Sequence, residues 1–135
     1  FPDAIANGSY RVDIHHQDKP GITLRYLDGR EEYCRPGHPA AVSRWRPETA
    51  ENPTFYQIPY RAMLPGTHPN GLIAGRMVDA DPQAHAAIRV MVNLKQPGEA
   101  AGVAAYLALA GSGDVRRLNI EQLKSTLADG GSIII

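Results

Sequence analysis

The pattern of hydrophobic and polar positions changes character near residue 70. The first part combines short strand-forming runs with nine of the eleven prolines, which predicts strands joined by long connections. The second part is rich in alanine, and between Pro82 and Gly111 only Arg89, Lys95 and Glu99 are charged. A helical stretch with so few charges is expected to be buried on most sides. We therefore expect an α+β fold, with antiparallel strands followed by three C-terminal helices.

The clearest local prediction is a β-hairpin over residues 22–35. Two runs rich in strand-forming residues, 22–27 and 30–35, flank the dipeptide Asp28-Gly29. Such a dipeptide suits a two-residue type I′ turn, in which both residues adopt positive φ angles.

The other strands are predicted from weaker patterns. Residues 36–54 contain four prolines and no periodicity, so we expect a loop there. Residues 55–64 are expected to resume as a strand in which Pro59 marks an edge or a bulge. The apolar run 72–78 is typical of a short buried strand. We take residues 1–71 as one β-rich unit with long loops and residues 72–135 as a C-terminal strand with helices.

Three helices are predicted from their start and stop signals. Asp81-Pro82 places a capping residue before a proline at the first helical position. Pro97-Gly98 is expected to break the helical pattern. Asn119 and Gln122 have the spacing of a capping box. The predicted helices cover residues 81–95, 98–110 and 119–130.

Composition narrows the class of protein. The chain has 135 residues, with fourteen Lys and Arg balanced by fourteen Asp and Glu, so it lacks the basic excess of a nucleic-acid-binding or membrane-surface domain. No stretch approaches the ~20 apolar residues of a membrane helix. A single cysteine, Cys34, excludes an internal disulfide framework and fits a reducing, cytoplasmic location. Because the first residue is Phe1 rather than Met, we expect that the chain was trimmed at its start.

Common catalytic and metal-binding motifs are missing from the sequence. His15-His16 follows Asp13, but adjacent side chains of a strand point to opposite faces and cannot chelate one ion together. No other His or Cys has ligand-like spacing, so we predict no metal site. Cys34 has no nearby sequence signal for a lowered pKa of its thiol. The glycine fingerprint of dinucleotide-binding folds, the P-loop and the nucleophile elbow are also missing.

The helix expected to open at Gly98 has unusually small side chains. Residues 98, 100, 101, 102, 104 and 105 are all Gly or Ala, which would let another backbone or a flat ligand approach closely. The free amides of such a helix start would favour a ligand with negative charge or a carbonyl oxygen. The alternative is tight packing of this helix on a sheet.

His85 and Arg89 are four residues apart on the first predicted helix and should share a face. An arginine in an apolar element needs a carboxylate or phosphate partner. That partner is either Asp79 or Asp81, or an anionic substrate or cofactor group. Two further arginines are Arg76, within the apolar run 72–78, and Arg61, after Pro59. On a central strand either arginine would have a functional role, whereas on an edge strand it would need none.

Taken in order, several motifs resemble the FAD-dependent oxidoreductases of the glutathione-reductase-like superfamily. Each motif is short, but their order and near-family spacing extend over most of the chain, with residues 17–54 least covered. They comprise Asp3–Tyr10 with Asp13-Ile-His15, Ile58-Pro-Tyr-Arg61, Leu72-Ile-Ala-Gly-Arg76, Ala84-His85, Arg89-Val-Met91, Gly98-Glu-Ala-Ala-Gly102 and the closing segment 118–130.

The resemblance implies that the chain is the C-terminal portion of a larger flavoprotein, a fragment of a two-domain FAD-binding fold. Residues 1–71 would belong to the substrate side, and residues 72–135 would complete the FAD-binding domain. The implied catalytic residues, which we call the substrate-side candidates, are His85 and Arg89, near the flavin or the substrate, followed by Arg61 and His15. The implied cofactor contacts are Gly75, Arg76, Pro97, Gly98, Glu99, Ala100 and Ala101, with the helix start at Gly98 aimed at the flavin.

Two functions are therefore considered. In the first, the intact protein is an oxidoreductase that binds FAD and a small-molecule substrate, and its missing N-terminal portion carries the glycine fingerprint. In the second, the chain is a non-catalytic α+β binding or assembly module. An upstream segment with that fingerprint in the gene would favour the first. Because the apolar helices would lack their neighbouring domain, we expect the isolated chain to self-associate and to be inactive.

Overall fold

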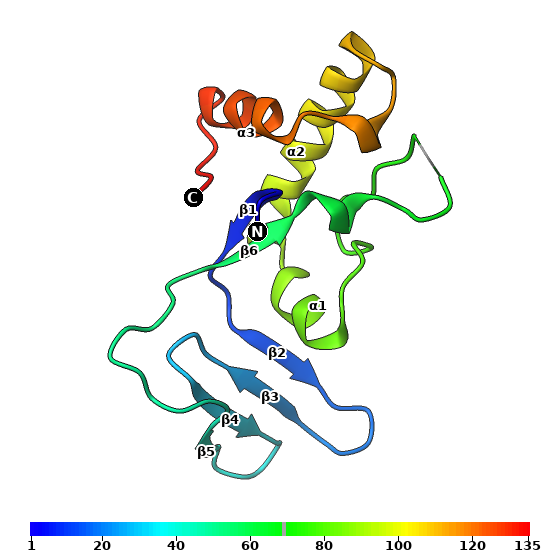
Figure 1. Ribbon diagram of the computed structural model, residues 1–135. Helices are drawn as coiled ribbons and strands as arrows, with labels where there is room; N and C mark the ends of the chain where they lie inside the picture. The colour runs from blue at the N-terminus through cyan, green and yellow to red at the C-terminus, as the bar shows by residue number, and fades with distance from the viewer. Residues whose placement is uncertain (69) are drawn as a thin grey trace.

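The fold is taken from a computed structural model that describes residues 1–68 and 70–135 (Figure 1). Strands come first in the chain and the helices follow, which confirms the predicted α+β class. The strands are β1 Ala4–Gly8, β2 Val12–His15, β3 Ile22–Arg25, β4 Arg30–Cys34, β5 Ala41–Arg44 and β6 Tyr56–Pro59. The helices are α1 Pro82–Ile88, α2 Met91–Ala110 and α3 Ile120–Asp129, with short 3-10 helices η1 Tyr60–Met63 and η2 Val115–Arg117.

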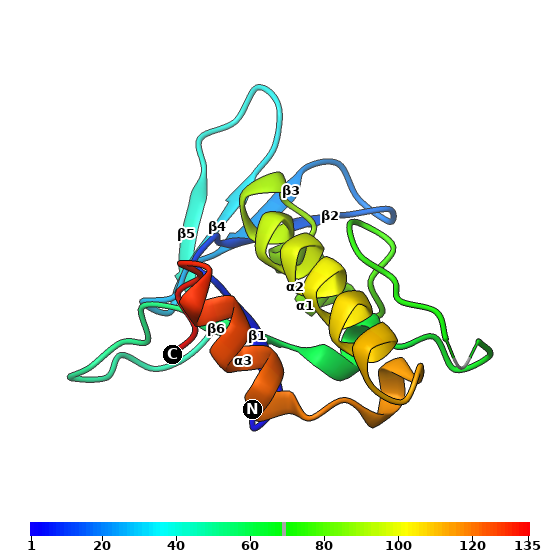
Figure 2. The ribbon, with the colours of Figure 1, turned by 90° about the horizontal axis from the view of Figure 1, so that it is seen from above.

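The strands form two separate antiparallel sheets. β1 pairs with β6, with Ala6 opposite Ile58 and Gly8 opposite Tyr56. The other four strands make a meander in the order β2-β3-β4-β5. In Figures 1 and 2, α2 and α3 lie beside β1 and β6, while α1 lies next to β2. The chain therefore passes from one sheet to the other twice, between β1 and β2 and between β5 and β6.

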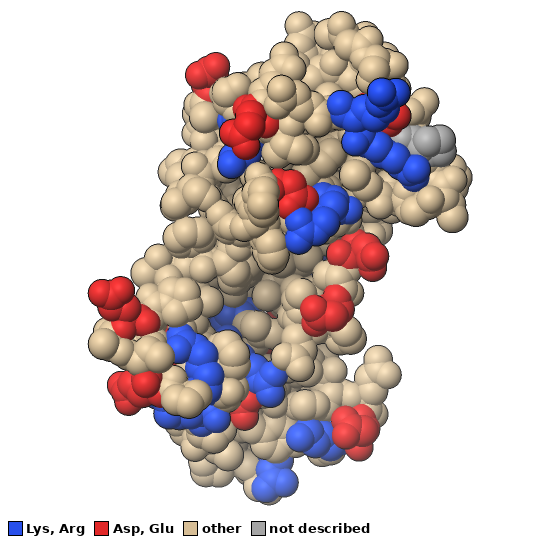
Figure 3. All heavy atoms as spheres, in the orientation of Figure 1, with Lys and Arg blue, Asp and Glu red and all other residues tan. Residues whose placement is uncertain are grey.

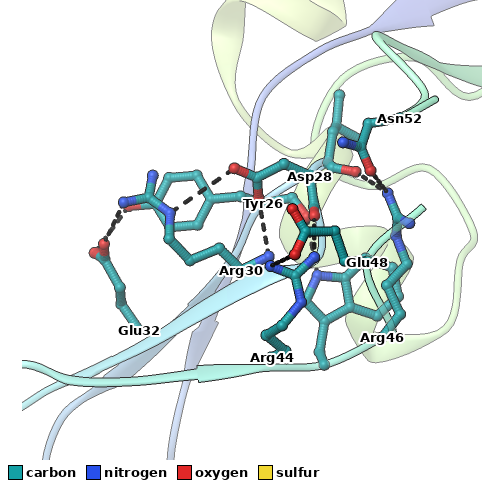
Figure 4. A network of polar contacts seen from close by, with 10 residues as sticks. Tyr26, Asp28, Arg30, Glu32, Arg44, Arg46, Glu48 and Asn52 are labelled. Atoms are coloured by element: carbon teal, nitrogen blue, oxygen red, sulfur yellow. Dashed lines mark hydrogen bonds and ion pairs between the residues drawn. The ribbon is translucent and has the colours of Figure 1, made fainter. Parts of the chain in front are cut away.

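The predicted hairpin is confirmed as β3 and β4, but its turn is not type I′. Gly29 has φ +86°, whereas Asp28 does not have a positive φ. The amide of Gly29 donates to the carbonyl of Tyr26, and the amide of Tyr26 donates to that of Arg30. The loop is thus three residues long, with glycine in the left-handed position. Figure 4 shows the polar groups around it, including Arg44 donating to the Asp28 carbonyl at 2.8 Å.

The loop predicted over 36–54 contains a strand, and this expectation was wrong in part. β5 pairs with β4, placing Ser43 opposite Glu31, and every residue of β5 is exposed. An exposed edge strand has no hydrophobic alternation to reveal it, because none of its side chains is buried in the core.

Two further strand predictions need correction. The strand expected over 55–64 ends at Pro59 and continues as η1, whose Tyr60 and Met63 are buried. The strand expected over 72–78 is not formed. Ile73 donates one backbone hydrogen bond to Met63, after which Gly75, at φ +89°, turns the chain. A glycine that adopts the left-handed conformation ends extended structure, because a strand requires negative φ angles.

The helix starts at Asp81-Pro82 and Asn119 are confirmed, and the predicted break at Pro97-Gly98 is wrong. Asp81 and Asn119 each accept hydrogen bonds from two amides of the following turn. α1 ends at Ile88, and α2 begins at Met91 and runs through Pro97 without interruption. Proline removes one helical hydrogen bond, and the burial of Pro97 in the core offsets that loss.

One hydrophobic core joins both halves of the chain. Ile5 of β1 and Ile58 of β6 pack with Ala100 and Ala104 of α2 and with Leu123 of α3. α2 is therefore buried along one stripe of small side chains. The expectation that it is buried on most sides was wrong, since Met91 and Leu109 are 82% and 84% exposed. In the described residues, no helix is long and apolar enough to cross a membrane.

Candidate flavin-side and substrate-side surfaces

A cleft of about 300 Å³ lies between β2 and α1, and we call it the Asp13–Arg89 cleft. Arg89, at the C-cap of α1, donates to the carboxylate of Asp13 on β2 at 2.6 Å. The expected partners Asp79 and Asp81 were wrong. Asp81 caps α1, and a residue 76 positions earlier holds the arginine instead. The cleft is lined by Asp13, Ile14, His15, Gln17, Pro82, His85, Ala86 and Arg89.

This cleft brings together three of the four predicted substrate-side residues. His85 and Arg89 both line it, as their spacing on a helix predicted. His15 contributes from β2, with Nε2 at 3.8 Å from Asp13 and a side chain that is 65% exposed. His16 points elsewhere and contacts Thr23 at 2.7 Å. The cleft thus offers two imidazoles and an ion pair to a polar ligand.

Arg61 lies outside the cleft. Its guanidinium forms an ion pair with Asp3 and lies over the ring of Phe1, 4.8 Å from the ring centroid. The side chain is 56% exposed. The structure therefore explains Arg61 by its contacts with the N-terminal residues.

The Gly75–Arg76 segment is a turn beside α1. The carbonyl of Arg76 lies 2.9 Å from Nε2 of His85, and the Arg76 side chain is exposed. Met77, the next residue, is 73% exposed. The two predicted cofactor contacts thus flank His85 on an open surface, although they do not lie on a strand.

The segment 97–101 lies inside α2, and its residues are partly buried in the core and partly exposed at the surface. Pro97 and Ala100 are buried against the core, whereas Gly98 and Glu99 reach the surface and Ala101 is half-buried. Glu99 accepts from the hydroxyl of Ser132 at 2.6 Å. Because no helix begins at Gly98, the amides there belong to the helix interior and cannot donate to a ligand.

The outer face of α2 is open, and apart from Lys95 its side chains are uncharged. A Cβ built at Gly98 or Gly102 would meet no described atom within 4 Å. Tyr106 is 69% exposed. We call this surface the α2 outer face, and it comprises Met91, Lys95, Gly98, Gly102, Tyr106 and Leu109, all exposed.

The true N-terminus of α2 lies at Val90. The amides of Asn93 and Leu94 donate to the Val90 carbonyl, and Val90 has no side-chain group to cap the helix. The first amides of α2 therefore have no helical acceptor. Met91 and Val92, which carry them, are 82% and 68% exposed. The first helical residue, Met91, lies seven residues before the predicted start at Gly98, and an electron-rich group is stabilised at such a helix start.

Asn93 fixes the start of α2 to the core and was not predicted as important. It is 4% exposed, and its amide donates to the Tyr56 hydroxyl at 2.7 Å and to the Ala87 carbonyl at 2.9 Å. Burial raises the pKa of Tyr56 to about 12, so this hydroxyl stays protonated. Only its polar character within a mostly apolar stretch distinguishes Asn93 in the sequence.

A scan against protein-family models found a match over residues 1–127 to a family described as FAD dependent oxidoreductase. The chain belongs to this FAD dependent oxidoreductase family. Searches of the curated proteins and of the solved structures found no match. The family gives FAD as the cofactor. The narrower resemblance to the glutathione-reductase-like superfamily stays a prediction.

The open surface of α2 leaves room for a flat ligand such as FAD, the cofactor of the family. Gly98 and Gly102 leave the α2 backbone open, and the uncapped amides at Met91 and Val92 suit an electron-rich ring edge. The sequence has no glycine fingerprint to hold a pyrophosphate. Figure 3 shows one face of the molecule, on which basic and acidic side chains are interspersed. Among the described residues, no three His, Cys, Asp or Glu side chains gather as metal ligands.

Proposed function

We propose that this chain is the C-terminal part of a FAD-dependent oxidoreductase and closes its flavin site. Residues 72–135 would complete the FAD-binding domain, and residues 1–71 would face the substrate. The observation that carries this proposal is the α2 outer face, an open and largely apolar surface in a chain that belongs to a flavoprotein family. Large exposed apolar patches mark interaction sites in proteins of this kind.

The start of α2 is our proposed contact with the flavin. The amides of Met91 and Val92 would donate to the electron-rich pyrimidine edge of the ring, where reduction places negative charge. Gly98, Glu99 and Ala101 would line the path by which the N-terminal portion approaches. Gly75 and Arg76 would border the same surface through the turn that contacts His85. Bound FAD supplies the acceptor and donor of hydride or electrons.

The Asp13–Arg89 cleft is our proposed substrate side. Asp13 holds the guanidinium of Arg89 in place, and the remaining N–H groups of Arg89 can bind an oxygen of the substrate. When His85 donates its Nε2 proton to the Arg76 carbonyl, its Nδ1 is left as an acceptor for a substrate proton. His15 would orient the substrate from β2. The guanidinium of Arg61 already forms an ion pair with Asp3, so Arg61 has no role in this proposal.

The partners follow from this arrangement. They are the N-terminal FAD-binding portion of the intact protein and a small-molecule substrate.

We also propose a cytoplasmic location, because Cys34, the single cysteine, has no second cysteine in the chain with which to form a disulfide.

The decisive experiment is a Gly98→Leu substitution in the intact flavoprotein. In this chain a side chain at 98 meets open space, and replacing a helical glycine should stabilise α2 by about 0.5–1 kcal/mol. At the proposed interface the same side chain blocks close approach. We therefore expect normal folding of the variant together with a loss of flavin, measured by the visible absorbance of the purified protein.

The matched control is Ala128→Leu, at an exposed position of α3. It adds a leucine to an exposed helix position that is not part of the α2 outer face and should retain its flavin. If Gly98→Leu retains the same flavin content as Ala128→Leu, the α2 outer face does not close the flavin site.

A further inference from the structure

A second cavity, of about 360 Å³, lies between the two sheets, on the other face of α1 from the Asp13–Arg89 cleft. α1 contributes Ala84, Ala87 and Ile88 to this cavity, whereas His85 and Arg89 line the cleft. Figure 3 shows the surface hollowed between the four-stranded sheet and the part above it. The aromatic residues that line the cavity are Phe1, Tyr10, Tyr26, Trp45 and Tyr56, and we call it the aromatic cavity.

The Tyr56 wall is held by packing and by two hydrogen bonds at the hydroxyl end of its ring. A Cβ at Gly8 would lie 2.3 Å from the Tyr56 ring, so the ring rests directly on the glycine backbone of the paired strand. The Tyr56 hydroxyl, at this end of the ring, donates to the Ala87 carbonyl at 2.9 Å and accepts from Asn93. The ring cannot swing to fill the cavity without breaking both hydrogen bonds.

The opposite wall is held in the same way. Trp45 donates its indole N–H to the Tyr26 carbonyl at 2.9 Å, and the Tyr26 hydroxyl donates to Glu32 at 3.0 Å. The guanidinium of Arg30 covers the Tyr26 ring, 4.1 Å from its centroid, as Figure 4 shows. Arg11 stacks on both Tyr10 and Tyr26. Polar tethers and cation–π contacts thus keep these rings apart rather than collapsed on one another.

The polar groups at the edge of the cavity are already engaged. Arg25 donates to Glu31 at 2.7 Å and to Gln83 at 2.8 Å. Gln57 accepts from the N-terminal amine at 2.6 Å. Arg25 is the charged side chain in the cavity lining, and because it is already paired with Glu31, a charged ligand would lose its hydration without gaining a free charged side chain there, which is costly. The chemistry of the lining therefore selects an uncharged ligand.

We propose that the aromatic cavity binds a small, uncharged, planar aromatic molecule. Its volume lies within the roughly 300–1,000 Å³ of small-molecule sites, and rings prefer offset-stacked or edge-to-face contacts with other rings. This inference goes beyond the proposed oxidoreductase function, because α1 separates the cavity from the cleft.

The test uses 2-naphthol as the probe on the full 135-residue chain, with affinity measured by calorimetry. Trp45 is the single tryptophan, so the one indole N–H signal in an NMR spectrum reports on the cavity directly. We expect saturable binding with a shift of that signal. Decahydro-2-naphthol, which is similar in size but not planar, and 2-naphthoate, which is charged, should bind more weakly.

Two variants probe the cavity itself. Ala84→Leu fills it from α1, and Trp45→Ala removes a wall that is 42% exposed and dispensable for the core. Each should weaken 2-naphthol binding by about tenfold or more. Ala84→Leu does so because its side chain occupies the cavity, and Trp45→Ala because an apolar contact is lost. Ala110→Leu, at the exposed end of α2, should bind normally. The proposal is overturned if 2-naphthol does not saturate, if the indole signal stays unmoved, if both variants bind normally, or if the decahydro analogue or 2-naphthoate binds as tightly.

Discussion

Tyr60 shows how one residue makes the stability of this fold depend on pH. The residue is 2% exposed, and its hydroxyl donates to the Val115 carbonyl at 2.8 Å. Burial, together with the negative charge of Asp114, raises the pKa of Tyr60 to about 12. The fold therefore favours the protonated phenol well above the ordinary tyrosine pKa of 10.0.

We predict that the protein loses stability as the pH rises from about 10 to about 12. Below pH 10 both states hold the Tyr60 proton. Above it the unfolded state loses the proton first, so the free energy of unfolding falls until the folded pKa of about 12 is passed. Tyr56, whose pKa is also about 12, acts in the same direction. Urea titrations between pH 8 and pH 12 measure this loss.

Tyr60→Phe should reduce that pH-dependent loss while lowering the stability at pH 8 by about 1–2 kcal/mol, since the Val115 carbonyl loses its donor. Tyr106→Phe, on the open face of α2, serves as the matched control and should leave the profile unchanged. An identical alkaline slope in wild type and Tyr60→Phe would show that Tyr60 does not contribute.

At the same scale, pairwise contacts were the least predictable feature. The sequence indicated that Arg89 needs an anion, and the structure provides Asp13 from a strand on the other side of the cleft. Helical periodicity placed His85 beside Arg89, because that relation is local. The pairing with Asp13 depends on how α1 packs on β2, which no local pattern encodes.

At the level of elements, the starts of α1 and α3 were predicted correctly from their capping residues, whereas the helix end predicted at Pro97 was wrong. Asp81 and Asn119 were identified from local chemistry, and both accept the amides expected of them. Pro97 was taken as a helix end, yet its ring is buried and α2 continues. Burial of the stripe from Pro97 to Ala108 outweighs the loss of one hydrogen bond. This stabilisation comes from tertiary packing, which the helix propensities of single residues do not include.

Asn119→Ala should destabilise the protein by about 1 kcal/mol, because the first amides of α3 lose their acceptor. Asn119→Ser retains a capping oxygen and should cost much less. Thermal or urea unfolding of the two variants measures the difference. Equal stabilities of the alanine and serine variants would mean that the cap does not stabilise α3.

On the scale of the whole molecule, the ordered motifs predicted the family more reliably than composition did. Composition excluded a membrane helix and a disulfide framework but named no chemistry. The core joins Ile5, near the start of the chain, to Leu127, near its end, so both halves are needed to bury it. The α2 outer face is left without a partner in this chain.

We expect the isolated chain to form a dimer or larger oligomer that covers this face. Light scattering at micromolar concentration should give a mass above the 14.7 kDa of one chain. Leu109→Glu, which places a charge at a position that is 84% exposed, should shift the chain toward a monomer. A monomeric wild-type chain would contradict this expectation.

The central claim, that the α2 outer face and the Gly75–Met77 turn are covered in the intact flavoprotein, is tested most directly by methionine oxidation. The chain has three methionines: Met63 is fully buried, whereas Met77 and Met91 are 73% and 82% exposed in this chain. Treating the flavin-loaded protein with peroxide and following each sulfoxide by mass spectrometry compares the three sites. We expect Met77 and Met91 to oxidise nearly as slowly as Met63. Oxidation of both at the rate found in the urea-unfolded protein would contradict it.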